Sequence, residues 1–195
     1  ERSFDPNDPD AKERLEKLSH SIIEQIDGLT KIANEFSNFA KMPRAKEEEL
    51  DLNEVIDVCV ELFEQSKDCT ICWSRPSHSS IVLADKDLLI RVFNNLLKNG
   101  VQAIPKDRKG HIEIELISLN NEFIVSIKDN GIGIPKDKHE KIYVPNFTTK
   151  STVTGLGLAM VKQIIEQAKG RVHFNSTENV GSTFYVTLPQ ISKED

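Results

Sequence analysis

Apolar residues recur at spacings of three and four along the N-terminal part of the chain, which is the pattern of one helix face. The stripe spans about seven or eight turns and comprises Leu15, Leu18, Ile22, Ile26, Leu29, Ile32, Phe36 and Phe39. Asp8 followed by Pro9 predicts the start of this helix, and Pro43 predicts its end. Because so long a stripe exceeds what a lone globular helix needs, we expect a bundle or coiled-coil helix that requires partners, rather than one packed on its own domain.

Beyond the charged linker at 44–49, short helical and strand patterns alternate. Leu50 and Leu52 are expected to end a short strand, with Asn53 as the N-cap of a helix. Asp85 is expected to cap a second helix, and a third is expected from Gly155 to a C-cap glycine, Gly170. The predicted strands are 69–74, 80–84, 111–119, 122–128, 171–176 and 182–188, with an Asn-Asn hairpin turn after the third.

This order of elements predicts an α+β fold, a two-layer α/β sandwich in which helices cover one face of one mixed sheet. Residues 135–154 lack periodicity and carry charges, as expected of a lid. We therefore divide the chain into a helix and linker at 1–46 and a larger domain at 47–195.

Composition narrows the function only a little. A net charge of −6 and a pI near 5.5 argue against a nucleic-acid surface. The three cysteines form no disulfide framework and fit a cytoplasmic, reducing compartment; Cys69 and Cys72 have zinc-like spacing, but no second ligand pair accompanies them. No apolar run approaches the ~20 residues of a membrane span, so any membrane anchor of the whole protein is expected outside this sequence.

Three short segments carry residues suited to a nucleotide. Asn95 and Asn99 are four residues apart and so share one helix face, where their amides can hold a hard cation or phosphate oxygens. Asp129 ends a strand and enters a glycine turn, where its carboxylate can accept a hydrogen bond from an exocyclic amine such as that of adenine. Gly155 and Gly157 open a helix, so that backbone N–H groups can approach phosphate.

In this order, and followed by Gly181-Ser-Thr-Phe184, these segments resemble the ATP-binding domain of the GHKL superfamily, and within it the sensor histidine kinases. The resemblance covers most of the chain. It aligns 95–99 with the N box, 129–133 with the G1 box, 147–150 with the F box, 155–157 with the G2 box and 181–184 with the G3 box. Residues 32–43 look most like the nitrogen-regulation type of sensor kinase.

The resemblance implies a Bergerat-type ATP-binding fold preceded by the second helix of a dimerisation hairpin. It implies that Asn99 coordinates Mg²⁺, that Asp129 binds the adenine amine, that Lys150 and the G2 backbone cover the phosphates, and that Thr183 reaches the base. The implied ATP-binding residues are Asn95, Asn99, Asp129, Gly131, Gly133, Ile134, Phe147, Thr149, Lys150, Gly155, Leu156, Gly157, Leu158 and Thr183.

Asn95 separates the branches of the superfamily. In hydrolytic members and in serine kinases a glutamate four residues before the metal-binding Asn acts as general base. An amide cannot take a proton at neutral pH, whereas a neutral imidazole acceptor is already nucleophilic. Asn95 therefore favours a histidine kinase.

The phosphoacceptor box, His followed by an acid and then a proline, is not recognised in this chain. None of its histidines fits the box: His20, His78, His111, His139 and His173. We therefore expect transfer to occur only in the whole protein, as a homodimer through the N-terminal helix, with a response-regulator receiver domain taking the phosphoryl group.

Two departures from the family pattern bear on the pocket. Val153 stands where a third G2 glycine is common, which is expected to stiffen the lid, and Gly100 stands where alanine is usual, which is expected to loosen the N-box helix. Two functions remain as alternatives to the histidine kinase: a non-catalytic nucleotide-responsive or dimerisation module, and a GHKL ATPase.

Overall fold

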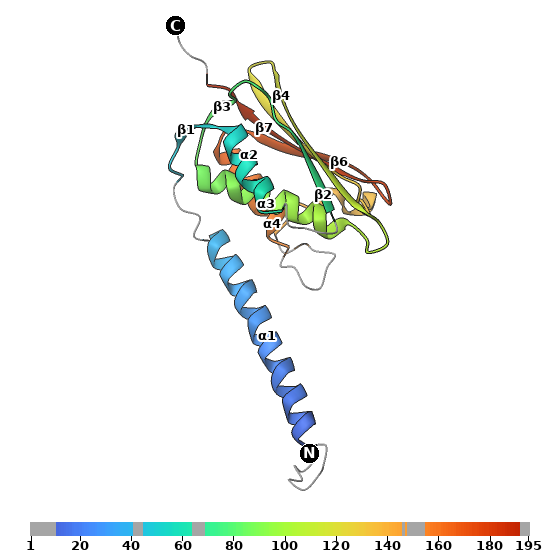
Figure 1. Ribbon diagram of the computed structural model, residues 1–195. Helices are drawn as coiled ribbons and strands as arrows, with labels where there is room; N and C mark the ends of the chain where they lie inside the picture. Colours follow the sequence, from blue (N-terminus) through green and yellow to red (C-terminus); the bar gives the residue numbers. More distant parts are fainter. Residues whose placement is uncertain (1–10, 41–44, 64–68, 146, 148–154, 192–195) are drawn as a thin grey trace. The chain divides into compact units, whose positions relative to one another are not determined.

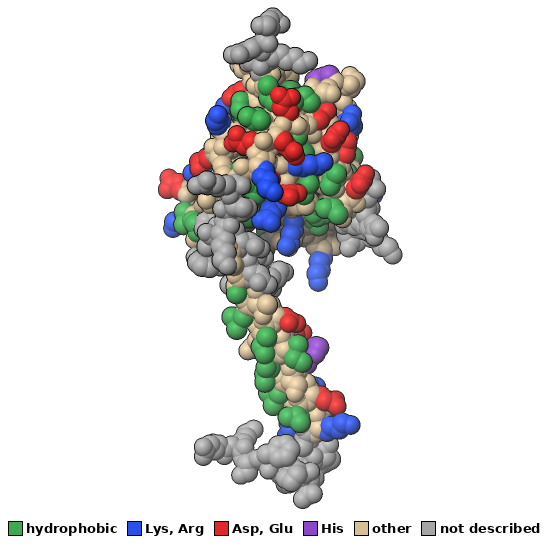
Figure 2. Space-filling view, turned by 90° about the vertical axis from the view of Figure 1, so that its left-hand side faces the viewer, with side chains coloured by type: hydrophobic (Ala, Val, Ile, Leu, Met, Phe, Trp, Pro, Cys, Tyr) green, Lys and Arg blue, Asp and Glu red, His purple; other side chains and the backbone are tan. Residues whose placement is uncertain are grey.

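The computed structural model describes residues 11–40, 45–63, 69–145, 147 and 155–191, which fall into two units. The first is the single helix α1 (Ala11–Ala40), 30 residues long, as the apolar stripe predicts. Its predicted first residues, Asp8 and Pro9, and the predicted stop at Pro43 lie outside the described residues. Figure 2 shows apolar side chains gathered along the helix, and the most exposed are Leu15, Leu18, Ile22, Ile23, Ile26 and Leu29, each more than half exposed. That this stripe needs partners stays a prediction.

The second unit is a two-layer sandwich, as predicted. Its sheet has the order β2-β4-β5-β7-β6, with β2 parallel to β4 and the other pairs antiparallel. The strands are β2 (Cys69–Ser74), β4 (Gly110–Leu119), β5 (Glu122–Asp129), β6 (Arg171–Thr177) and β7 (Gly181–Pro189). The helices α2 (Leu52–Glu61), α3 (Lys86–Ala103) and α4 (Gly157–Gln167) cover one face of this sheet (Figure 1).

The core lies between the helix layer and the sheet. Alternate residues of the three central strands point to the helices, because successive strand side chains face opposite sides. The fully buried members of this interface include Ile112, Ile114, Val125, Val186 and Leu188 from the strands and Leu89, Val92, Phe93, Leu96 and Leu97 from α3. The helix α3 is thereby fixed across the middle of the sheet, with its polar face directed away from the core.

One part of the predicted topology is wrong: the strands do not form a single sheet. β1 (Glu48–Asp51) and β3 (Ile81–Ala84) pair antiparallel as a separate two-stranded sheet. Sequence spacing identifies both strands but carries no information about which strands pair.

The cap of α2 is also different from the prediction. Leu52 is the first residue of the helix rather than the end of a strand, and the N-cap is Asp51 rather than Asn53. Asp51 Oδ1 accepts hydrogen bonds from the N–H groups of Asn53 (3.0 Å) and Ser80 (2.9 Å), so one carboxylate both caps the helix and ties it to the segment before β3. The predicted cap at Asp85 is confirmed, since its Oδ1 accepts from Leu88 N–H at 3.1 Å.

The helix α4 begins at Gly157, two residues later than predicted, and ends in a Schellman-type turn in which the left-handed residue is Lys169 (φ +57°), not Gly170. The Gly170 N–H donates to Ile165 O at 2.8 Å. A Cβ on Gly170 would lie 2.3 Å from Thr187 O, so this glycine permits close approach of the turn to β7 instead of supplying the positive φ.

The turns and the predicted lid complete the unit. Asn120 (φ +52°) and Asn121 (φ +60°) form the predicted Asn-Asn hairpin turn between β4 and β5. Within 135–154, where no regular element is predicted, Lys136–Lys141 form a 3₁₀ helix, η1. Residues 146 and 148–154 lie outside the described part of the chain.

Candidate functional site

The centre of the site is the carboxylate of Asp129, at the end of β5. This strand lies between β4 and β7, so its end is held from both sides, and Asp129 is only 7% exposed. Its Oδ1 accepts hydrogen bonds from the N–H groups of Gly131 (2.8 Å) and Ser182 (3.3 Å). A buried carboxylate fixed by backbone donors keeps one orientation, as recognition of a planar amine requires.

The glycine turn after Asp129 is closed by the hairpin between β6 and β7. Gly133 has φ +67°, and a Cβ there would lie 2.1 Å from Thr177 O, so only glycine fits. The next residue, Ile134, is half-buried, and its N–H donates to Ser176 Oγ at 2.7 Å. The predicted G1 residues Gly131, Gly133 and Ile134 thus form one turn anchored on two strands.

The N-box asparagines lie on α3 and are both half-buried, whereas Leu96 and Leu97 between them are buried in the core. Asn95 Nδ2 donates to Arg91 O at 2.9 Å, one turn earlier. Lys98 is exposed and lies off the face that the two asparagines share.

Gly100, directly after Asn99, packs toward Asp129. A Cβ at Gly100 would lie 3.1 Å from Ile112 Cδ1 and 3.5 Å from Asp129 Cβ. The sequence predicts that this glycine loosens the helix, and the packing adds that it sets how closely α3 approaches β4 and β5. The N box and the G1 carboxylate are therefore neighbours.

The G2 segment meets the same helix. Gly155 has φ +70°, Leu156 is buried, and α4 starts at Gly157 without a side-chain cap. A Cβ on Gly157 would lie 2.8 Å from Asn95 Oδ1, so the N-terminus of α4 abuts the N-box amide. Leu158 is half-buried in the first turn. The positive end of α4 therefore lies beside an amide oxygen, an arrangement suited to phosphate and its counter-cation.

The G3 segment brings Ser182 beside Asp129, and the predicted role of Thr183 in reaching the base stays a prediction. In the β5–β7 pairing Ser182 is opposite Asp129, and Thr183 is opposite Lys128. Directly paired residues share a sheet face, so Ser182 lies on the side of Asp129 and Thr183 on the other side. The Ser182 hydroxyl is 3.0 Å from Ser176 Oγ. Asp129 is the last residue of β5 and Ser182 the second residue of β7, and the sequence spacing carries no information about this pairing.

The F-box is described only in part. Phe147 is half-buried, and its N–H donates to Val144 O at 3.1 Å. Thr149, Lys150 and Val153 lie outside the described residues, so their predicted roles stay predictions.

An aromatic cluster next to the G1 turn was not predicted. The Phe174 ring makes edge contacts with His139 (4.9 Å between ring centroids) and Tyr143 (6.1 Å) and stacks on Phe184. His139 Nε2 is 2.9 Å from Ile134 O, which ties η1 to the turn. Burial raises the pKa of Tyr143 to about 12, so its hydroxyl stays protonated at physiological pH. In the sequence His139 and Tyr143 fall in the predicted lid, whereas Phe174 and Phe184 fall in predicted strands, so no local pattern brings the four rings together.

Arg108, in the connection between α3 and β4, was also missed. Its guanidinium donates to the carbonyl oxygens of Asn130 (2.6 Å), Gly131 (2.9 Å) and Asn179 (3.3 Å). A charged residue in a polar loop carries no periodic signal, so nothing in the sequence pattern marks it.

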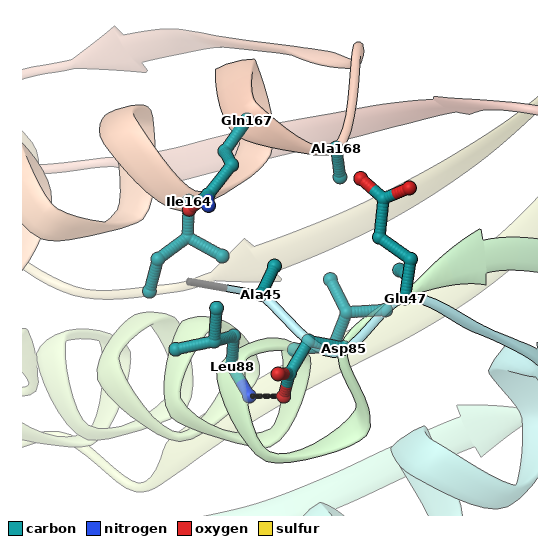
Figure 3. Close-up of a pocket in the computed structure, with 9 residues that line it drawn as sticks. Ala45, Glu47, Asp85, Leu88, Ile164, Gln167 and Ala168 are labelled. Carbon is teal, nitrogen blue, oxygen red and sulfur yellow. Dashed lines mark hydrogen bonds between the residues drawn. The ribbon is translucent and has the colours of Figure 1, made fainter. Parts of the chain in front are cut away.

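A small hollow lined by described residues lies elsewhere (Figure 3). It measures about 240 Å³ including open solvent and is lined by Ala45, Glu47, Ala84, Asp85, Leu88, Leu89, Ile164, Gln167 and Ala168. Asp85 caps the start of α3, and Asn99 follows 14 residues later, about 20 Å along the helix. This hollow is therefore separate from the site around Asp129.

The described residues contain no group of three or more His, Cys, Asp or Glu side chains that could hold a metal ion. That Cys69 and Cys72 form no zinc site stays a prediction. Burial and the nearby Asp129 charge raise the pKa of the Cys69 thiol. Among the described helices none has the length and apolar character to cross a membrane.

Comparison with known proteins gives this site a family. Residues 84–192, which span every described site residue, match the family of histidine kinase-, DNA gyrase B- and HSP90-like ATPases. The chain belongs to this family. Its relatives place it on the sensor histidine kinase branch, as the resemblance implies: it is 31% identical over 183 residues to the sensor protein kinase WalK of Staphylococcus saprophyticus and 32% identical over 182 residues to the sensor histidine kinase ZraS of Salmonella typhimurium.

These matches cover 88% and 91% of this histidine-kinase-like chain, but only 30% and 39% of the relatives. Solved structures agree. The catalytic domain of the histidine kinase ThkA superposes with a TM-score of 0.67 at 31% identity, covering 74% of this chain and 96% of that one. ThkA in complex with the response regulator TrrA gives a TM-score of 0.72 at 26% identity, over 98% of this chain and 54% of that one. The α+β fold is thus that of a histidine kinase catalytic domain.

Proposed function

We propose that this chain is the ATP-binding kinase core of a two-component sensor histidine kinase. In the whole protein it would bind Mg-ATP and transfer the γ-phosphoryl group to a histidine outside this sequence. The observation that carries the proposal is the convergence of four motifs on one carboxylate and one amide face. Gly131 and Ser182 hold Asp129, Gly100 packs against it, and Gly157 abuts Asn95.

Asp129 would accept a hydrogen bond from the adenine amine, and Ser182 rather than Thr183 would lie beside this carboxylate. The fixed position of Oδ1 supports this role, because the carboxylate does not have to be ordered when the base arrives. The buried side of the turn, with Ile134 and the aromatic cluster, would shield the base from water. Gly155, Leu156, Gly157 and Leu158 would direct backbone N–H groups at the phosphates, with Phe147, Thr149 and Lys150 closing over them.

Mg²⁺ would be held by Asn99, with phosphate oxygens and water completing its shell. Mg²⁺ usually takes few protein ligands at nucleotide sites, so a single half-buried amide oxygen on the N-box face fits the ion. When bound, the ion would neutralise developing charge on the phosphoryl oxygens. Asn95 would orient the phosphates by donating a hydrogen bond to a phosphate oxygen, rather than act as a base.

Asn95 also supports transfer over hydrolysis. Its amide donates to Arg91 O and cannot accept a proton from water at neutral pH. The task left to this chain is placement of the γ-phosphoryl group before an incoming imidazole. A response-regulator receiver domain is the proposed next acceptor, supported by the ThkA–TrrA complex. A homodimer through α1 is the proposed assembly, supported by its exposed apolar stripe.

The proposal is tested by calorimetric titration of the chain with ADP and with a non-hydrolysable ATP analogue, with and without Mg²⁺. Binding by the parent chain and its loss in Asp129→Asn are expected, because the amide presents a donor to the adenine amine. Asn99→Ala is expected to remove only the Mg²⁺-dependent part. Transfer of radiolabelled γ-phosphate to a supplied acceptor hairpin, against steady phosphate release without one, separates the kinase from the ATPase. Absence of nucleotide binding by the parent would overturn the proposal.

A further inference from the structure

We propose that Arg108 is a positioning residue of this site, which holds the Asp129 turn and the β6–β7 turn together by clamping backbone carbonyls from both. The inference rests on the proposed nucleotide function for its consequence, and on the geometry of three hydrogen bonds for its mechanism. Arg108 itself contacts no reacting atom. It acts through Asp129.

Three backbone carbonyl oxygens converge on the Arg108 guanidinium. Arg108 Nη1 donates to Asn130 O at 2.6 Å and to Gly131 O at 2.9 Å, the two residues that follow Asp129. Nη2 donates to Asn179 O at 3.3 Å, which belongs to the turn 71 residues further on. Carbonyl oxygens that point to one place repel each other unless a cation or several donors lie between them. A planar guanidinium supplies both.

The clamped turn carries the Gly131 N–H, one of the two donors that orient the Asp129 carboxylate. The Gly131 N–H donates to Asp129 Oδ1, and the Gly131 carbonyl accepts from Arg108. The peptide groups before and after Gly131 are therefore both held by hydrogen bonds. Ile132 continues the same network, because its N–H donates to Ala103 O at 2.9 Å and its O accepts from Asn179 N–H at 2.7 Å. Releasing Arg108 would loosen the donor that orients the carboxylate.

The contacts of Arg108 differ from those of an arginine in a surface ion pair. Arg108 is half-buried, and the three hydrogen bonds of its clamp all go to backbone carbonyl oxygens. Arg171, in contrast, makes an exposed bidentate ion pair with Glu122. Exposed ion pairs contribute little to stability. Glu122 begins β5 and Asp129 ends it, so the Arg171 pair lies at the other end of the strand from the site. Arg171→Gln is therefore a matched control for loss of an arginine.

The experiment compares Arg108→Lys, Arg108→Gln and Arg171→Gln with the parent chain, each at a temperature where circular dichroism shows it folded. Lysine keeps the charge but not the planar fork. We expect both Arg108 variants to raise the Kd for ADP about ten-fold, the equivalent of about one hydrogen bond to a charged group. The same ratio is expected with the non-hydrolysable ATP analogue, because the effect arises at the base end. The Kd of Arg171→Gln should stay within about two-fold.

Amide hydrogen exchange without nucleotide supplies the second readout. Faster exchange at Gly131 and Ser182 is expected in both Arg108 variants and not in Arg171→Gln, because these N–H groups orient Asp129. Parent-like Kd values in the Arg108 variants, or unchanged exchange at Gly131, would overturn this inference while leaving nucleotide binding by the parent intact. A larger loss for the ATP analogue than for ADP would also overturn it, since that pattern indicates direct contact with phosphate. If the parent binds no ADP, the proposed function itself fails.

Discussion

Gly157 and Asn95 are in such close contact that a Cβ on Gly157 would lie 2.8 Å from Asn95 Oδ1. The pair joins the first residue of α4 to the middle of α3, and the two residues lie 62 positions apart in the sequence. An amide oxygen beside the positive end of a helix is a favourable arrangement. The contact places the start of α4 directly against the N-box face of α3.

Gly157→Ala is expected to weaken Mg-ATP binding without destabilising the fold. The obstructing atom is the far end of a flexible side chain, so Asn95 can rotate away, and alanine is a better helix former than glycine by up to about 1 kcal/mol. Calorimetry with the non-hydrolysable analogue and a denaturant titration measure the two effects. The double variant with Asn95→Ala is the control, because removing the amide should make the Gly157 substitution nearly silent. Equal losses in both backgrounds would show that Gly157 acts independently of Asn95.

Ser182→Ala is expected to weaken nucleotide binding more than Thr183→Ala. Ser182 pairs with Asp129 and is buried, and its hydroxyl contacts Ser176, so its loss removes about one hydrogen bond, about 1 kcal/mol or five-fold in Kd. Thr183 lies on the opposite face, and its Kd ratio should stay within about two-fold. Titration of both variants with ADP decides between them. A larger effect at Thr183 would restore the residue that the family resemblance indicates.

The contrast between Ser182 and Thr183 separates the features of the site that the sequence predicts from those that it does not. Asp129, Gly131, Asn95 and Gly157 lie in short motifs whose residue types are tied to local geometry, a strand end, a turn and a helix start, and all four were predicted to belong to the site. Long apolar periodicity likewise predicts α1 and α3, because burial of one helix face is a local property of spacing.

Features that depend on pairing between distant segments were not predicted. Ser182 rather than Thr183 faces Asp129 only because of the β5–β7 register, and β1 pairs with β3 outside the main sheet. Asp51 replaces Asn53 as the helix cap because its carboxylate also binds Ser80 N–H, a contact across 29 residues. Arg108 donates to backbone carbonyl oxygens, which every residue has, so no side-chain pattern could reveal its contacts.

The three cysteines are expected to react with a thiol reagent at very different rates. Cys72 is exposed, whereas Cys59 is fully buried and burial raises its pKa to about 12. Since the thiolate is the reactive form, Cys59 should be inert in the native state. Absorbance measured with an aromatic disulfide reagent at pH 8 should show one fast thiol, lost in Cys72→Ser, and three thiols in denaturant. Fast reaction of Cys59 in the native chain would contradict its placement in the core.

Acid is expected to destabilise the fold partly through Glu122. Its hydrogen bonds from Arg171 hold the pKa of this carboxyl below its ordinary value near 4.5. The unfolded chain therefore binds the proton at higher pH than the folded chain, so the contribution is present above about 4.5 and is lost as pH falls through the lower folded value.

Denaturant titrations at pH 6 and pH 3.5 should show a smaller acid-induced loss in Glu122→Gln than in the parent. The difference should be small, because the pair is exposed and screened by salt. Glu115→Gln, an exposed glutamate on neighbouring β4, is the control and should follow the parent. Carbon-detected NMR titration of the Glu122 carboxyl tests the cause directly, and Arg171→Gln should return its pKa toward the ordinary value. An unchanged titration in Arg171→Gln would remove the ion pair as the origin of the shift.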